Sequence, residues 1–228
     1  MFCICVLLFH GGKYILGEAS LKNGIHASCF VHGSIGVEFF FVLSGFLMAK
    51  SVYKKTHSDK IESLGNETFN FMTRKIKGFL PEHIISFIFA LITYIIMENF
   101  GLKKIINYVI ESLPSFFLLQ MLGFKFEIPN NIEWYISAML LVMLMLYPLM
   151  IKNYDCFVNI IAPIISLGLL GYLSYTYGSL TGVMVWTGFC YKSALRAIAE
   201  IALGTVAFEI CRKFSELELS KSKRFLLS

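Results

Sequence analysis

Apolar runs of near membrane-spanning length recur along most of this chain, and they restrict its fold more than any other feature. Of its 228 residues, 57% are hydrophobic and only 15% are charged, which is more apolar surface than a soluble domain of this size can bury. A transmembrane helix needs about 20 residues to cross the hydrocarbon core. Runs near that length cover residues 37–53, 81–98, 134–151, 155–176 and 194–210.

Two further segments are less regular. Residues 105–122 are interrupted by Glu111 and Pro114, so they form either a kinked span or a partly interfacial segment. The opening stretch MFCICVLLFHGG places nine residues before His10, about 14 Å of helix. We expect a first transmembrane helix whose opening residues are missing; a cleaved signal peptide is the alternative, although no basic residue precedes the run. The sequence thus predicts an all-α polytopic membrane helix bundle of about six to seven transmembrane helices, with residues 1–228 forming a single domain.

The distribution of Lys and Arg predicts the orientation. Residues 11–33 hold only Lys13 and Lys22, whereas residues 50–77 hold seven basic side chains. By the positive-inside rule, a loop over residues 54–79 is cytoplasmic, and so is the N-terminus of this cell-membrane protein. Simple alternation from there would place the basic C-terminal tail outside. Either residues 105–122 do not cross, or residues 181–191 dip in and out of the bilayer, and the sequence leaves both open.

The cysteines and the net charge exclude several other classes. The six cysteines show no CxxC or Cys/His spacing, so neither a disulfide framework nor a metal site is predicted. The net charge of +5 indicates no nucleic-acid partner, because in a membrane chain the placement of Lys and Arg follows topology. The expected partner of these helices is the lipid bilayer.

One carboxylate lies inside an apolar run, in GSIGVEFFFVLSGFLMAKS over residues 33–51. On a helix, Glu38, Val42, Gly45 and Ala49 fall within one narrow stripe, so Glu38 faces the bundle interior. Gly45 and Ala49 form a small face on which a neighbouring helix can approach closely. Glu38 must meet a donor or water, because an unpaired charge in hydrocarbon is costly, and it is a candidate site residue. The alternative is that Glu38 only caps the outer helix end, where the helix dipole favours a carboxylate.

Three stretches carry a resemblance to a known family. Residues 33–50, GSIGVEFFFVLSGFLMAK, resemble the pattern G-x-x-G-V-[DE]-x-F-F-V-L-S-G-F-L. Residues 71–84, FMTRKIKGFLPEHI, resemble an R-x-x-R-x-x-x-P segment that opens a third helix, and residues 133–140, EWYISAML, resemble a W-x-[LI]-S span. Over essentially its whole length the chain is similar to the acyltransferase 3 family, membrane proteins that acylate sugar hydroxyls.

The chain also departs from the pattern of that family. An arginine that the family places upstream of the histidine would fall before Met1. Lys77 stands where the second arginine of R-x-x-R is expected, and Met139 occupies the place where many members carry a glutamate. Members of the family have more helices than this chain, so we expect it to be truncated at both ends.

The resemblance implies an O-acyltransferase with the following roles. His10 is the expected general base that removes the proton of the acceptor hydroxyl, and Glu38 orients groups within the core. Arg74 and Lys77 are expected to bind the phosphates of an acyl-coenzyme A donor on the cytoplasmic side, helped by the N-terminal dipole of a helix starting at Pro81. The expected acyl group is acetyl, and the acceptor is a cell-surface or lipid-linked carbohydrate.

The residues alone leave simpler interpretations open. A histidine at a helix end is often an interfacial residue, and Arg74 and Lys77 are also typical of plain topology charge. Two other functions remain open for the whole chain. One is an inactive fragment of the same family. The other is a non-enzymatic carrier component for polysaccharide precursors, for which paired broken segments in two halves are expected; the sequence shows no such pairing.

Overall fold

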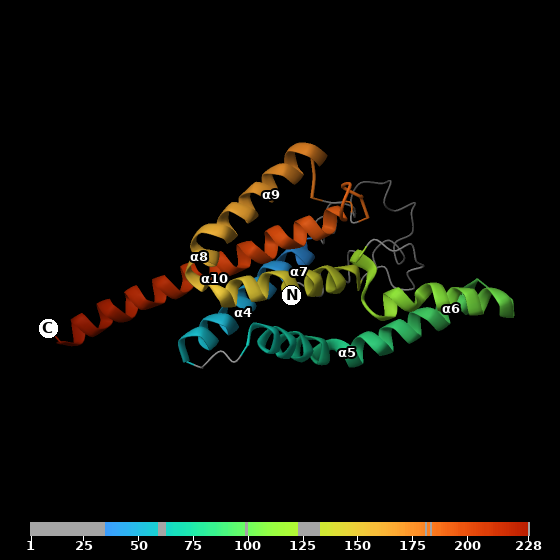
Figure 1. The fold of residues 1–228 in the computed structure, drawn as a ribbon, viewed down its shortest axis with the longest axis horizontal. Coiled ribbons are helices and arrows are strands. Elements are labelled where there is room, and N and C mark those ends of the chain that lie inside the picture. The colour runs from blue at the N-terminus through green and yellow to red at the C-terminus, as the bar shows by residue number, and fades with distance from the viewer. Residues whose placement is uncertain are drawn as a thin grey trace, which may run out of the picture.

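The computed structural model describes residues 35–58, 63–98, 100–122, 133–180, 182 and 184–227, and almost all of them are helical (Figure 1). The elements follow in the order α4 (Ile35–Ser58), α5 (Leu64–Met97), α6 (Leu102–Phe116), the 3-10 helix η1 (Gln120–Leu122), α7 (Trp134–Lys152), α8 (Tyr154–Cys156), the π-helix η3 (Phe157–Ile161), α9 (Ala162–Tyr177) and α10 (Lys192–Leu227). Within these residues the β pairing is limited to an isolated bridge between Trp186 and Tyr191. The predicted all-α class is confirmed.

Several of these helices have the length and composition to cross a bilayer. In the described part of the chain there are four, which span Ile35–His57, Leu64–Met97, Trp134–Lys152 and Tyr154–Tyr177. They cover four of the predicted apolar runs, so the polytopic membrane bundle is confirmed as the fold class. The predicted run 194–210 lies in α10, a helix of 36 residues that carries Arg196, Glu200 and Glu209 along it. The expected first helix, ending at His10, lies outside the described residues.

Residues 105–122 do not form one long helix. α6 has 15 residues, about 22 Å at the usual helical rise, which is short of the ~30 Å hydrocarbon core. Its buried residues, Tyr108, Ser112 and Ser115, lie on one side of the helix. Tyr108 stacks on Tyr94 of α5 with ring centroids 4.8 Å apart, and the two helices project together from the bundle (Figure 1). By length, the structure favours the topological alternative in which this segment does not cross.

α5 begins much earlier than predicted. Ser63 caps its N-terminus, because the Ser63 hydroxyl accepts a hydrogen bond from the Asn66 N–H over 3.2 Å. The predictions of a loop over residues 54–79 and of a helix start at Pro81 are therefore wrong, since Pro81 lies inside α5. A proline in a helix interior lacks the N–H that would bond the carbonyl four residues before it, here that of Lys77.

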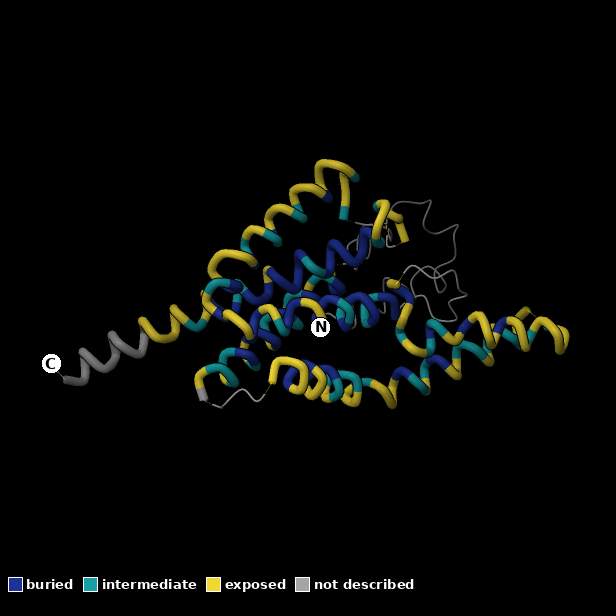
Figure 2. Tube along the Cα trace, in the orientation of Figure 1, coloured by how far each residue is buried: buried dark blue, intermediate teal, exposed yellow. Residues whose placement is uncertain are grey.

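The core is centred on α4, α7 and α10, where buried residues concentrate (Figure 2). α4 and α10 approach at two glycines. Gly45 of α4 faces the backbone of Ile201, and Gly204 of α10 faces the backbone of Val42; a Cβ at either glycine would overlap the carbonyl oxygen opposite. Ala49 is fully buried. The prediction that Gly45 and Ala49 allow a neighbouring helix to approach closely is confirmed.

α5 is joined to this core mainly through α7. Phe71 of α5 stacks on Tyr147 of α7 with centroids 4.0 Å apart and ring planes at 11°. Near the start of α5, the buried Glu67 forms an ion pair with Lys55 of α4, with 3.2 Å between Nζ and Oε1. These contacts hold the first half of α5 against the bundle.

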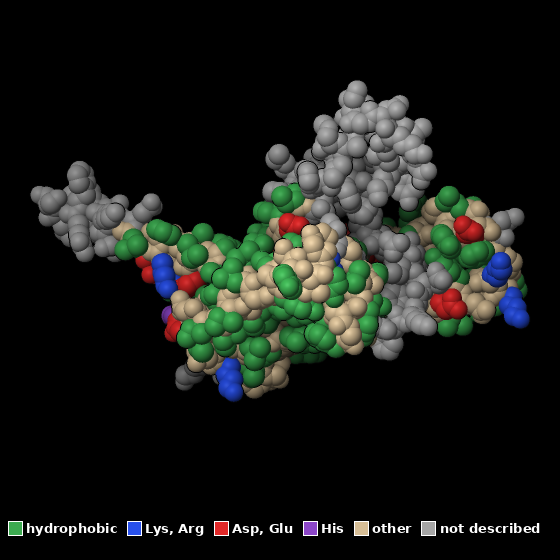
Figure 3. Space-filling model, turned by 90° about the horizontal axis from the view of Figure 1, so that it is seen from above, with side chains coloured by type: hydrophobic (Ala, Val, Ile, Leu, Met, Phe, Trp, Pro, Cys, Tyr) green, Lys and Arg blue, Asp and Glu red, His purple; other side chains and the backbone are tan. Residues whose placement is uncertain are grey.

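The outer surface is largely apolar. Figure 3 shows hydrophobic side chains over most of one face, with most of the visible charged side chains toward its two ends. Large side chains such as Phe89 on α5 and Leu167 on α9 are 73% and 70% exposed. A surface of this kind is stable where lipid covers it. The structure therefore supports the expected bilayer environment.

Candidate functional site

Glu38 lies in the first turn of α4 and forms an ion pair with Arg196 of α10. The Arg196 Nη2 donates to the Glu38 Oε1 over 2.7 Å. The Arg196 side chain is 4% exposed and that of Glu38 is 34% exposed. The carboxylate thus faces the bundle, as the helical stripe predicts, and its donor is a guanidinium 158 positions further along the chain.

Arg196 holds two other groups in addition to Glu38. Its Nε donates to Glu200 Oε1 over 2.7 Å, and its Nη1 donates to the Leu180 carbonyl oxygen over 3.3 Å. Glu200, one turn further along α10, has a side chain only 5% exposed. We call Glu38, Arg196 and Glu200 the α4–α10 ionic cluster. It connects α4, α10 and the segment that follows α9.

Arg196 and Glu200 are not among the candidates predicted from the sequence, where residues 194–210 count as one apolar span. A signal for them exists: Arg and Glu four residues apart lie on the same helix face and can pair. An ionisable pair inside an apolar run also marks a candidate functional site. What the sequence does not reveal is that this pair meets Glu38.

A second buried carboxylate on α10, Glu209, is held differently. Its Oε2 accepts hydrogen bonds from Arg212 Nε at 2.9 Å and from the Tyr154 hydroxyl at 3.1 Å. Its Oε1 pairs with Arg212 Nη2 and, at 3.4 Å, with Lys213 Nζ. Both oxygens of Glu209 are therefore matched by cations or donors.

Arg74 and Lys77, the predicted donor-binding residues, lie exposed on α5. Neither makes a hydrogen bond or ion pair with another described residue, whereas Lys75 between them has its Nζ 5.9 Å from the centroid of the Phe71 ring. The predicted help from a helix N-terminus is wrong, because α5 starts at Leu64, about 15 Å before Arg74, and the dipole effect is confined to the first turn. The structure does not bring Arg74 or Lys77 into contact with Glu38.

His10, the predicted general base, lies outside the described residues, so its role stays a prediction. The place of the family glutamate, Met139, is described. The hydroxyl of Ser44, which belongs to the resembling stretch on α4, donates to the Met139 sulfur over 3.1 Å. At the position where many family members would carry a carboxylate, Ser44 thus meets a weak thioether acceptor.

A buried histidine on α5 is a residue that sequence reasoning missed. His83 Nδ1 lies 2.8 Å from Glu133 Oε2, and its Nε2 lies 3.0 Å from the Phe116 carbonyl oxygen. A carbonyl oxygen only accepts, so Nε2 carries a proton. Both ring nitrogens are engaged, and His83 therefore joins α5, the end of α6 and the start of α7 rather than presenting a vacant nitrogen for base catalysis.

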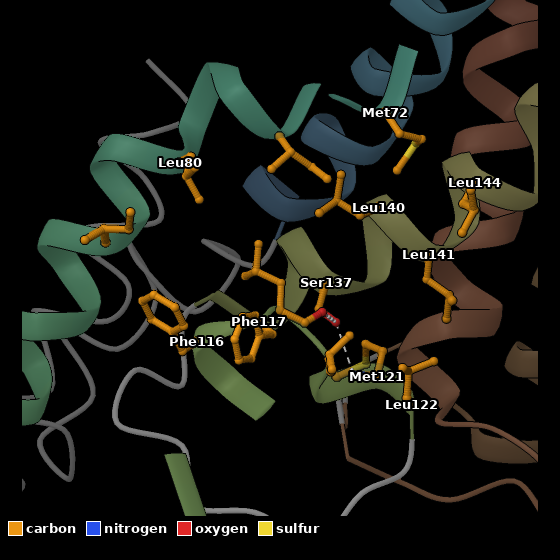
Figure 4. A pocket seen from close by; sticks show the side chains of 14 residues that line it. Met72, Leu80, Phe116, Phe117, Met121, Leu122, Ser137, Leu140, Leu141 and Leu144 are labelled. Atoms are coloured by element: carbon orange, nitrogen blue, oxygen red, sulfur yellow. Dashed lines mark hydrogen bonds between the residues drawn. The ribbon is translucent and has the colours of Figure 1, made fainter. Parts of the chain in front are cut away.

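An apolar groove runs along the seam between α5 and α7 (Figure 4). It consists of one pocket of about 610 Å³ and a second of about 430 Å³, which share Met72 and Leu144. Among the described residues that line the larger pocket Ser137 is the single polar one, and its hydroxyl donates to the Leu118 carbonyl over 2.6 Å. The groove suits an apolar chain, and its described lining holds no side chain for acid or base chemistry.

The described residues also bear on metal binding. No three His, Cys, Asp or Glu side chains among them are placed to hold a metal ion. Cys156, Cys190 and Cys211 are free thiols.

Comparisons with known proteins identify the family. The model of a family described as an acyltransferase domain matches residues 1–221 of the 228. No curated protein and no solved structure gives a significant match. The family match covers the described helices except the last six residues of α10, and it includes the α4 stretch with Glu38 and the α10 stretch with Arg196. This chain is a multi-pass membrane protein that belongs to the acyltransferase 3 family.

Proposed function

We propose that this protein transfers an acyl group, acetyl in the simplest case, from acyl-coenzyme A to a hydroxyl of a cell-surface or lipid-linked carbohydrate. The observation that carries the proposal is the α4–α10 ionic cluster. It places two carboxylates around one buried guanidinium, at the start of the helix that holds the family signature. Ionisable groups inside a membrane bundle are costly and mark functional sites by default.

In this proposal the acyl donor is bound through its phosphates. Arg74 and Lys77 are exposed and make no hydrogen bond or ion pair within the described residues, so a guanidinium fork and an ammonium are available to an anion. The predicted orientation puts them on the cytoplasmic side, where coenzyme A is found. Lys75 is the natural control, because its ammonium already lies over the Phe71 ring.

The transfer step follows from the chemistry of thioesters. His10 takes the proton of the acceptor hydroxyl as its oxygen attacks the thioester carbonyl. The carbon–sulfur bond breaks, an ester forms, and the coenzyme A thiolate receives a proton. Glu38 and Arg196 act as positioning residues that fix the start of α4 against α10.

The proposal is tested in membranes that contain the full chain, with radiolabelled acetyl-coenzyme A as donor and the glycans of those membranes as acceptors. We expect label in the glycan fraction and about 10²-fold less in a His10→Ala variant, the usual scale for loss of a general base. Arg74→Ala should raise the KM for acetyl-coenzyme A, and Lys75→Ala should leave it unchanged. Full labelling with His10→Ala would remove His10 from the mechanism, and equal effects of Arg74→Ala and Lys75→Ala would assign these cations to topology alone.

A further inference from the structure

The α4–α10 ionic cluster has one positive and two negative groups. Arg196 is shared by Glu38 and Glu200, so with both carboxylates ionised the cluster carries a net charge of −1. α9 contains no charged residue, and α7 contains none except Lys152 in its last turn. On α10, Lys192 lies two turns before Glu200 and has its Nζ 4.9 Å from the centroid of the Tyr177 ring. Among the described residues, Arg196 is the cation with which Glu38 and Glu200 form ion pairs, and neither carboxylate pairs with a second one.

The two carboxylates differ in burial. The side chain of Glu38 is 34% exposed, whereas that of Glu200 is 5% exposed. Removing a charge from water costs several kcal/mol in a protein interior, so the uncompensated charge is least stable on the more buried group. The second negative charge is therefore less favourable on Glu200 than on Glu38, which forms its ion pair with Arg196 nearer to solvent.

The hydrogen bonds indicate where the proton sits. Oε1 of Glu200 accepts from Arg196 Nε, and Oε2 is buried without a hydrogen-bond partner among the residues that the structure describes. An ionised carboxylate oxygen in that position would be unsatisfied, at a cost larger than for a neutral group. A protonated Oε2 carries no such charge and changes from an acceptor into a donor. Glu209, whose oxygens are both matched, has no need of a proton.

We propose that Glu200 is a proton-binding site inside the membrane bundle: a carboxylic acid that carries its proton on Oε2 while Glu38 and Arg196 form the ion pair. This site goes beyond the acyl-transfer reaction and does not depend on it. The cluster is then electrically neutral in the interior, and it presents one hydrogen-bond donor that no described residue accepts.

Infrared spectroscopy tests whether the acid exists. The purified full chain is measured at neutral pH in a detergent without carbonyl groups, in H2O and in D2O. We expect a carboxylic-acid C=O band that shifts down in D2O in the wild type and in Glu209→Gln, and its loss in Glu200→Gln. Absence of the band in the wild type, or its persistence in Glu200→Gln, would overturn the proposal.

Thermal melting then tests which carboxylate is the acid. Glu200→Gln imitates the neutral acid and leaves the ion pair of Glu38 intact, so it should melt at the wild-type temperature. Glu38→Gln forces the negative charge onto the buried Glu200 and should melt earlier. The reverse order, with Glu200→Gln melting below Glu38→Gln or failing to fold, would assign the proton to Glu38 and overturn the proposal.

Discussion

Replacement of Gly204 by alanine tests the contact that brings α4 and α10 together. A Cβ at Gly204 would overlap the Val42 carbonyl oxygen and lie 2.9 Å from the Phe46 nitrogen and from the Val42 carbonyl carbon. All three atoms are backbone, so no side-chain rotation relieves the contact, and the two helices must move apart. Overpacking of this kind costs about 1–3 kcal/mol, and the better helix propensity of alanine returns up to about 1 kcal/mol. We expect Gly204→Ala to lose up to about 2 kcal/mol of unfolding free energy.

Gly168→Ala is the matched control, because Gly168 is in the middle of α9 and has nothing within 4 Å of an added Cβ. The same chemical change should stabilise the protein there by up to about 1 kcal/mol. The assay is thermal unfolding in detergent, followed by far-UV circular dichroism. For a chain of this size about 1 kcal/mol corresponds to a shift of roughly 2–4 °C in Tm. A Gly204→Ala variant that melts at or above Gly168→Ala would refute the close backbone contact between α4 and α10.

Three further predictions concern the ion pairs and the orientation. Arg196→Leu should destabilise the protein by about 3 kcal/mol in the same melting assay. This value is at the lower end of the range for a broken buried pair, because Glu38 is one-third exposed. An unchanged Tm would contradict the ion pairing within the α4–α10 ionic cluster. His83→Phe should lower the unfolding free energy by about 1–3 kcal/mol, because Glu133 then lacks its ring partner. In a double-mutant cycle with Glu133→Leu, the two losses of unfolding free energy should be less than additive. Full additivity would show that the pair is not coupled. In a chain without its own cysteines, Ser58→Cys should react with an impermeant thiol reagent only after the cells are permeabilised, and labelling in intact cells would reverse the predicted orientation.

The fold class and the inward direction of Glu38 could be predicted from the sequence. Apolar run length and helical periodicity are local properties, so they predict four of the spanning helices and the stripe that carries Glu38 and Gly45. Composition and run length predicted the wrong helix start where a helix continues through a proline. α5 extends from Leu64 through Pro81 because its N-cap is Ser63, and the local rule that favours proline at a helix start gave the wrong boundary.

The ionic contacts were decided only by the tertiary structure. His83 meets Glu133 across 50 residues, and Arg196 meets Glu38 across 158. Such pairs depend on which helices pack together and on their register, and no pattern within one helix contains that information. For α4 and α10 the register is determined by backbone contacts at Gly45 and Gly204, where only a hydrogen fits between the helices. The sequence alone therefore determined that this chain is a membrane helix bundle with a carboxylate turned inward, and the packing of α10 on α4 determined which guanidinium that carboxylate binds.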